Sequence, residues 1–130
     1  MRITLKRGQI RKDKNYVGAI DTTVKSATKE GKCLAPTWEM VLGHKAGKVT
    51  DQEYTNRYEI ILNKIEKSWW DNLFKEKEKE GTITFLCYCR DEWFCHTHLI
   101  IENLKKKFPD KVLDGREIKP KQIQDEFKLI

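Results

Sequence analysis

One strand constrains the fold of this 130-residue chain more than any other segment. Residues 82–89 read Thr-Ile-Thr-Phe-Leu-Cys-Tyr-Cys, and toward their end they are apolar at both odd and even positions. A strand that is apolar on both faces is typical of the interior of a parallel sheet, where helices cover both sides. The segment therefore predicts a sheet with helices packed against it.

Shorter patterns on either side of this strand alternate between strand and helix. Strands are predicted at residues 2–6 and 16–21, with a loop at 8–15, and an edge strand is predicted at 111–113. Helices are predicted to begin at Pro36, at the capping box from Thr50 to Glu53, at Ser68, at Cys95 and at Lys119, with Pro109 ending the fourth. This alternation predicts one small α/β domain over residues 1–130, with a mostly parallel sheet flanked by helices in a three-layer, Rossmann-like arrangement.

Two of the four tryptophans lie at helical spacing with aliphatic residues. Trp38 would share a helix face with Val41 and Leu42, and Trp70 lies in a similar pattern, so both are predicted to belong to the core. Trp93 instead lies in a polar loop, where an aromatic side chain more often touches a ligand or a partner.

The net charge of +6 is confined to the first quarter of the chain. Nine basic and three acidic side chains lie in residues 1–32, and the remaining residues are balanced. A solvated face explains such a cluster, and so does a clamp in which Arg7, Arg11 and Lys12 hold an anion. The regional charge favours an anionic small molecule over a nucleic acid. No segment has the roughly 18 apolar residues of a membrane span and no signal segment opens the chain, so a cytoplasmic protein is expected.

Cysteine and histidine concentrate in the twelve residues that end with His98, which hold Cys87, Cys89, Cys95 and His96 as well. Ligands of parallel α/β sheets bind at the carboxyl ends of the strands, so this segment is predicted to share one rim with residues 21–23. Disulfides are not expected, because four cysteines without an export signal indicate a reducing compartment.

Three kinds of chemistry fit this cluster. Zinc prefers cysteine and histidine ligands, but two cysteines that are two residues apart on a strand do not form the usual zinc knuckle. No metal or cofactor is therefore predicted. A four-ligand zinc site that includes Cys95 and His98 stays open. Alternatively, Cys95 at a helix N-terminus is a thiol nucleophile with a lowered pKa, and His96 or His98 is its base. In the third case the helix start binds phosphate while Tyr88 or Trp93 stacks on a ring.

The same residues carry a resemblance. The run Phe-Leu-Cys-Tyr-Cys at 85–89, followed after a short loop by Cys95-His96, is similar to a motif of domain-of-unknown-function family 488 and of small uncharacterised phage proteins related to it. Segments 21–26, 34–38 and 54–58 fit as well, so the resemblance spans about residues 17–104. It implies an α/β fold resembling nucleotide-binding folds and no settled activity. Relatives commonly have Arg where this chain has Thr97, which implies that His98 or a basic N-terminal residue holds the anion here.

The leading hypothesis is a cytoplasmic domain that binds an anionic, nucleotide-like small molecule; a phage-encoded chain would sequester a signal in the host cytoplasm. The candidate ligand-binding residues are Arg7, Arg11, Lys12, Asp21, Thr22, Thr23, Tyr88, Cys89, Trp93, Cys95 and His96. One alternative is a thiol-dependent enzyme in which Cys95 and His98 act on such a substrate. Another is an adaptor that binds nucleic acid or protein through the basic segment, and self-association also stays open.

Overall fold

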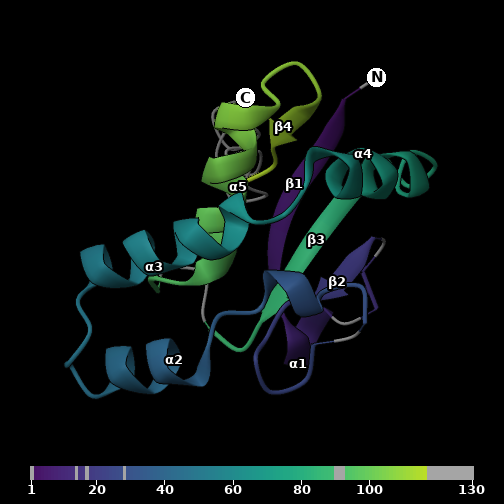
Figure 1. The fold of residues 1–130 in the computed structure, drawn as a ribbon. Coiled ribbons are helices and arrows are strands. Elements are labelled where there is room, and N and C mark those ends of the chain that lie inside the picture. The colour runs from purple at the N-terminus through teal and green to yellow at the C-terminus, as the bar shows by residue number, and fades with distance from the viewer. Residues whose placement is uncertain (1, 14, 17, 28, 90–92, 117–130) are drawn as a thin grey trace, which may run out of the picture.

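A computed structural model describes residues 2–13, 15–16, 18–27, 29–89 and 93–116. Its centre is a four-stranded parallel sheet in the order β2-β3-β1-β4 (Figure 1). The strands are β1 (Ile3–Gln9), β2 (Ala19–Asp21), β3 (Thr82–Cys87) and β4 (Val112–Asp114). The strand that is apolar on both faces, β3, lies in the interior, and β4 lies at an edge, so the predicted parallel α/β class is confirmed.

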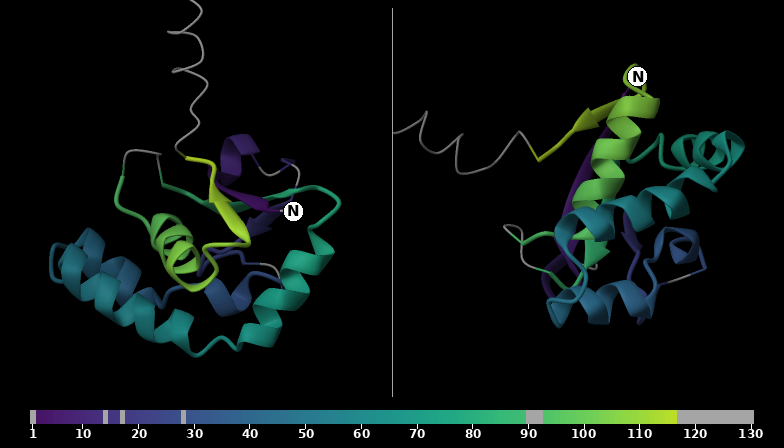
Figure 2. Two further views of the ribbon diagram at one scale, coloured as in Figure 1. Left: turned by 90° about the horizontal axis from the view of Figure 1, so that it is seen from above. Right: turned by 60° about the vertical axis from the view of Figure 1, so that its left-hand side comes forward.

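The helices cover the two faces of the sheet unequally. They are α1 (Ile10–Asp13), α2 (Trp38–Lys45), α3 (Asp51–Asn63), α4 (Lys67–Glu76) and α5 (His96–Lys107), with a 3-10 turn η1 (Lys32–Leu34). Seen from above, α3, α4 and α5 lie on one side of the sheet and α1 on the other (Figure 2). Among the described residues the second helical layer is therefore this single turn, and Lys6 on β1 stays exposed. None of the described helices combines the length and the apolar character that crossing a bilayer needs.

Local signals account for most helix ends. The predicted capping box is present at α3, where the Thr50 hydroxyl accepts a hydrogen bond from the Glu53 N–H at 3.1 Å. The helix that begins after Cys95 ends at Lys107, two residues before Pro109, as predicted. Two starts differ: α2 begins at Trp38, after Thr37 as its N-cap rather than at Pro36, and α4 begins at Lys67 instead of following a Ser68 cap.

The N-terminal third differs more from the prediction. The first strand continues to Gln9 and passes into α1, where a loop was predicted, because the Asp13 carboxylate accepts a hydrogen bond from the Gln9 N–H at 2.7 Å. The second strand is shorter than predicted, since β2 begins at Ala19 and Tyr16 is exposed outside it.

The helix predicted at 119–129 lies outside the described residues.

The core lies between the sheet and the larger helical layer. Tyr58, Trp70, Phe85 and Ile100 are fully buried there, which confirms the prediction for Trp70. The core prediction for Trp38 is wrong, because this side chain is 50% exposed. Met40 is the one fully buried residue of α2, so the helix lies at the periphery of the core and Trp38 remains half exposed.

Candidate functional site

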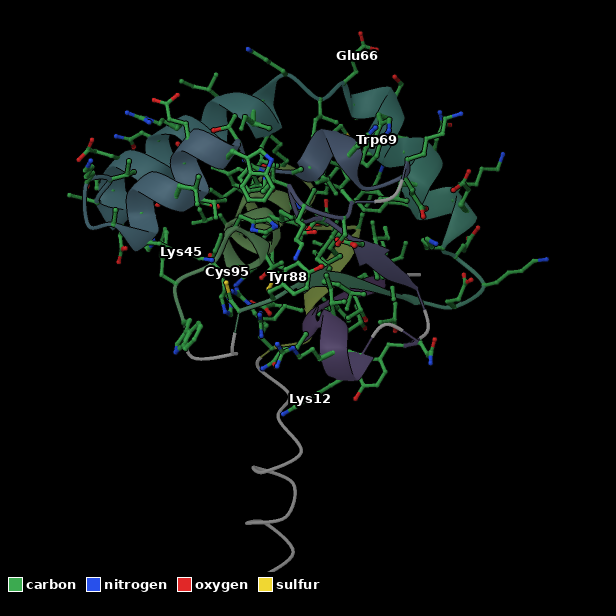
Figure 3. The ribbon with its side chains drawn as sticks, turned by 90° about the horizontal axis from the view of Figure 1, so that it is seen from below. Lys12, Lys45, Glu66, Trp69, Tyr88 and Cys95 are labelled. Carbon is green, nitrogen blue, oxygen red and sulfur yellow. The ribbon has the colours of Figure 1, made fainter. Side chains whose placement is uncertain are left out.

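A cavity of about 570 Å³ lies at the carboxyl end of β3. Its floor is made by Cys87, Cys89, Cys95 and His96, where β3 ends and α5 begins. Most of its remaining walls are aromatic or aliphatic, and they come from α2, from α3 and from the loops after β2 and β3: Val24, Pro36, Trp38, Val41, Tyr54, Tyr88, Trp93 and Phe94. Viewed from below, Cys95 lies between Lys45 and Tyr88 (Figure 3). The predicted rim at the strand ends is therefore hollow.

The sheet register explains why these segments meet. Gln9 on β1 pairs with Cys87, and Asp21 on β2 pairs with Leu86, so all three strands end at one edge. The wall opposite is fixed by aromatic packing: the Phe94 ring contacts the Tyr54 ring edge-on at 5.3 Å between centroids and the His44 ring at 5.0 Å. Neighbouring strand ends thus supply the floor, and helix packing supplies the wall.

Three of the four free cysteines converge on this floor. The sulfur atoms of Cys87, Cys89 and Cys95 all lie within 4.8 Å of one another, whereas Cys33 is exposed elsewhere. Cys87 and Cys95 are buried and Cys89 is half-buried. Hydrogen bonds with Cys87 and Cys89 lower the pKa of Cys95, whereas hydrogen bonds with Cys87 and Cys95 raise the pKa of Cys89. A negative charge on the cluster is therefore favoured at Cys95 over Cys89.

Arg7 lies under this cluster and joins three segments. Its Nη2 donates to the Cys89 carbonyl at 2.7 Å and lies 2.8 Å from the Cys87 sulfur, while its Nε donates to the Thr97 hydroxyl at 3.2 Å. Arg7 thus connects β1 to the loop after β3 and to α5. That a basic N-terminal residue holds an anion here stays a prediction.

His96 is held as a neutral ring. Its Nε2 lies 3.1 Å from the Thr22 carbonyl and 2.8 Å from the Thr22 hydroxyl, which itself donates to the Leu86 carbonyl. Both partners of Nε2 act as acceptors, so Nε2 carries the proton and Nδ1, 3.6 Å from the Cys95 sulfur, has a free lone pair. Burial lowers the pKa of His96 to about 4, so the ring is uncharged at neutral pH.

The Asp21 carboxylate is engaged in holding a turn. It accepts hydrogen bonds from the Thr23 N–H at 2.9 Å, from the Thr23 hydroxyl at 2.8 Å and from the Ser26 hydroxyl at 2.6 Å. The Ser26 hydroxyl also lies 2.9 Å from the Tyr88 hydroxyl, and Lys25 lies 5.9 Å from the centre of the Tyr88 ring. Asp21 and Thr22 therefore shape the cavity from behind, whereas Thr23, Lys25 and Tyr88 line it.

Six predicted site residues do not line the cavity: Arg7, Asp21 and Thr22, described above, and also Arg11, Lys12 and His98. Arg11 and Lys12 are exposed on α1, and Figure 3 shows Lys12 apart from Cys95 and Tyr88. His98 turns toward β4, where its Nδ1 lies 2.9 Å from Nη1 of Arg116. Among the described residues, the lysines that line the cavity are Lys25 and Lys45, which sequence reasoning did not select. Trp38 was also missed as a site residue, although the family resemblance at 34–38 contained a signal for it.

Asp114→Asn is expected to lower the free energy of unfolding by about 1–3 kcal/mol at pH 7, because the buried carboxylate binds the Arg116 guanidinium through two hydrogen bonds. Lys105 donates to the same carboxylate, and Glu102 and His98 contact Arg116 from α5. The Arg116 hydrogen bonds hold the pKa of Asp114 well below its usual value. Its contribution is therefore present above the unfolded pKa of about 3.9 and is lost as the pH falls below that value.

Urea denaturation of wild type and of Asp114→Asn between pH 7 and pH 3 measures the contribution of the Asp114 carboxylate to stability. Wild type should lose more stability than Asp114→Asn on acidification, and Asp110→Asn, at an exposed position, should behave as wild type. Equal acid sensitivity of wild type and Asp114→Asn would contradict the assignment.

The fold and the cavity define the class: a small parallel α/β domain whose strand ends form a pocket of ligand size, floored by thiols. Residues 7–108 match the sequence model of the family described as the active DUF488-N3 subclade, DUF488-N3a, and the chain belongs to that family. The comparisons with curated proteins and with solved structures gave no match.

Proposed function

We propose that this protein binds an anionic, ring-containing small molecule of the nucleotide type in the cavity at the end of β3. The observation that carries the proposal is the combination of size, aromatic walls and two lysines in one pocket. Its volume of about 570 Å³ lies within the range of small-molecule sites, which are mostly apolar with a few placed polar groups. This chain has that composition in the cavity wall.

The aromatic residues at the mouth suit a flat ring. Trp38, Tyr88 and Trp93 line the cavity and are each about half exposed, so they offer ring surface to a ligand. They come from α2 and from the segment between β3 and α5, and so a planar group is contacted from more than one element. Stacking of a base on such side chains contributes about 1–3 kcal/mol per ring.

The charge of the ligand is inferred from the polar groups around it. Lys25 and Lys45 enter the lining from the loop after β2 and from α2, and no Asp or Glu is among the described lining residues. The first N–H groups of α5 point toward its N-terminus, where the helix dipole favours an anion. These groups replace Arg11 and Lys12 in the predicted clamp, while Arg7 supports the floor from beneath.

The proposal includes a cytoplasmic setting, and for a phage-encoded chain the cytoplasm of its host, where the domain sequesters a nucleotide signal. All four cysteines are unpaired, which suits a reducing compartment. The enzyme hypothesis stays a prediction: Cys95 lines the cavity and the matching subclade is described as active, but the base would be His96 rather than His98. Binding of nucleic acid or protein through the basic segment, and self-association, stay predictions.

Trp38→Ala is expected to weaken nucleotide binding about tenfold without lowering the thermal stability of the free protein, because the side chain is half exposed. A thermal-shift screen of mono-, di- and cyclic nucleotides would identify the ligand, and calorimetry would give its affinity for each variant. Tyr16→Ala serves as the control, since Tyr16 is an exposed aromatic residue outside the cavity.

Absence of stabilisation by every nucleotide would refute the proposal, and so would equal affinities of Trp38→Ala and wild type. Mass spectrometry of the nucleotide after incubation separates binding from turnover. Recovery of the nucleotide unchanged would contradict the enzyme hypothesis and leave the binding proposal standing.

A further inference from the structure

The three sulfur atoms on the cavity floor form a convergent set of soft ligands. One comes from the last residue of β3, one from the loop that follows, and one from the N-cap of α5, so three separate backbone positions direct their thiols to one point. A buried cysteine usually serves as a small apolar side chain of the core, and this role accounts for a single buried thiol. It does not account for three sulfur atoms within 4.8 Å of one another.

The spacing of these sulfurs fits a bound metal ion. Tetrahedral zinc with Zn–S bonds of about 2.3 Å places its sulfur ligands about 3.8 Å apart. The separations within 4.8 Å therefore need a contraction of no more than about 1 Å, which side-chain rotations can supply. Sequence spacing argued against a zinc knuckle and left open only a set with Cys95 and His98. The fold brings the Cys95 thiol to the two cysteines of the strand end, while His98 is turned to Arg116.

The charges around the cluster also suit a cation held by thiolates. Three thiolates and one divalent cation carry a net charge of −1, and the Arg7 guanidinium lies 2.8 Å from the Cys87 sulfur. The Thr97 hydroxyl lies 3.8 Å from the same sulfur. Hydrogen bonds of this kind to metal-bound ligands orient them and tune the site. Arg7 would thus neutralise the metal–thiolate group from the side away from the cavity.

Among the described residues, three ligands converge at this point. His98 is turned to Arg116, and His96 lies outside the convergent set, although its Nδ1 is 3.6 Å from the Cys95 sulfur. Cys89 and Cys95 line the cavity, and hence the remaining coordination position faces it. Zinc sites with three protein ligands use such a position for water or a substrate atom.

We propose that Cys87, Cys89 and Cys95 bind one thiophilic divalent cation, Zn²⁺ above all, with its open position toward the cavity. We also expect a phosphate or ring atom of the bound small molecule to occupy the open position, and this part of the proposal depends on the proposed function. Binding of the metal ion itself does not depend on the proposed function.

The test uses the full chain, purified under reducing conditions without chelator. Competition with a chromophoric chelator should show one Zn²⁺ per chain, and Co²⁺ should give the near-ultraviolet absorption of thiolate-to-cobalt charge transfer. Cys89→Ser should weaken Zn²⁺ binding by at least about a hundredfold, more than the 10–100-fold typical of a lost outer-shell partner. Cys33→Ser is the matched control and should bind as wild type, because Cys33 is exposed and outside the cluster.

Substoichiometric Zn²⁺, absence of the Co²⁺–thiolate absorption, or equal losses in Cys33→Ser and Cys89→Ser would each overturn the metal site. Circular dichroism shows whether Cys89→Ser folds; if it does not, the wild-type stoichiometry and Co²⁺ spectrum decide alone. Repeating the nucleotide screen on chelator-treated and Zn²⁺-loaded protein keeps the two proposals separate. A metal site without nucleotide binding refutes only the proposed function, and nucleotide binding without metal refutes only this inference.

Discussion

Replacement of Gly18 by alanine is expected to destabilise the protein by more than about 4 kcal/mol, which for a small domain removes most of the stability. Gly18 has a φ of 71°, and a Cβ atom built there would lie 2.0 Å from the carbonyl oxygen of Thr82. The Gly18 carbonyl accepts a hydrogen bond from the Thr84 N–H at 3.0 Å. The backbone before β2 therefore lies directly against β3, and a side chain would force the two strands apart.

Gly47→Ala is the matched control for this prediction. Gly47 has nearly the same φ, 74°, and a Cβ atom there meets nothing within 4 Å. Its substitution should cost only about 1–2 kcal/mol, from the left-handed backbone conformation. Urea denaturation of both variants separates the cost of the contact with Thr82 from the cost of placing alanine in the left-handed backbone conformation. Similar stabilities of the two variants would show that the close approach at Gly18 is not maintained in solution.

Arg7→Met is expected to lower the free energy of unfolding by about 2–3 kcal/mol and to abolish ligand binding in the cavity. One guanidinium bonds the Cys89 carbonyl and the Thr97 hydroxyl and contacts the Cys87 sulfur, so it joins β1 to the loop after β3 and to α5. A hydrogen bond with a charged partner contributes about 1.5–3 kcal/mol, and the half-buried position of Arg7 keeps the total near that range; methionine retains only the apolar stem. The floor of the cavity would lose its support from beneath.

Two further variants interpret this result. Arg11→Met removes a basic residue that is exposed on α1, and it should leave stability and binding unchanged. Arg7→Lys retains the charge but not the forked geometry, so it should recover little of what Arg7→Met loses. Denaturation and nucleotide thermal shifts measure both effects. Equal behaviour of Arg7→Met and Arg11→Met would remove Arg7 from the site, and full recovery by lysine would assign its role to charge alone.

Several elements could be predicted because their signals are local. The apolar run at 82–89 required an interior strand, and the Thr50–Glu53 capping box placed the start of α3. These patterns depend on side-chain periodicity and on bonds between residues three or four apart. The same reasoning failed for Trp38, since spacing along a helix describes a face and does not say whether anything packs against it.

The candidate site was predicted only in part for the same reason. The segment from Cys87 to His96 could be located at a sheet rim, because parallel strands end together. Three contacts could not be predicted. Lys25 and Lys45 approach that rim, Arg7 contacts Cys87 across 80 positions of sequence, and His98 turns toward Arg116. Each depends on how loops close and how helices dock.

The amino-acid sequence alone determined that this chain forms a small α/β domain, with a net charge confined to its first quarter and a cysteine–histidine segment at the end of an interior strand. Only the tertiary structure decided which cations reach that segment and that three thiols share one floor. The periodicity of apolar side chains and the capping of helices act over a few residues, so both can be recognised directly in the sequence. Convergence of distant side chains follows from strand register and helix packing, which involve the whole chain at once.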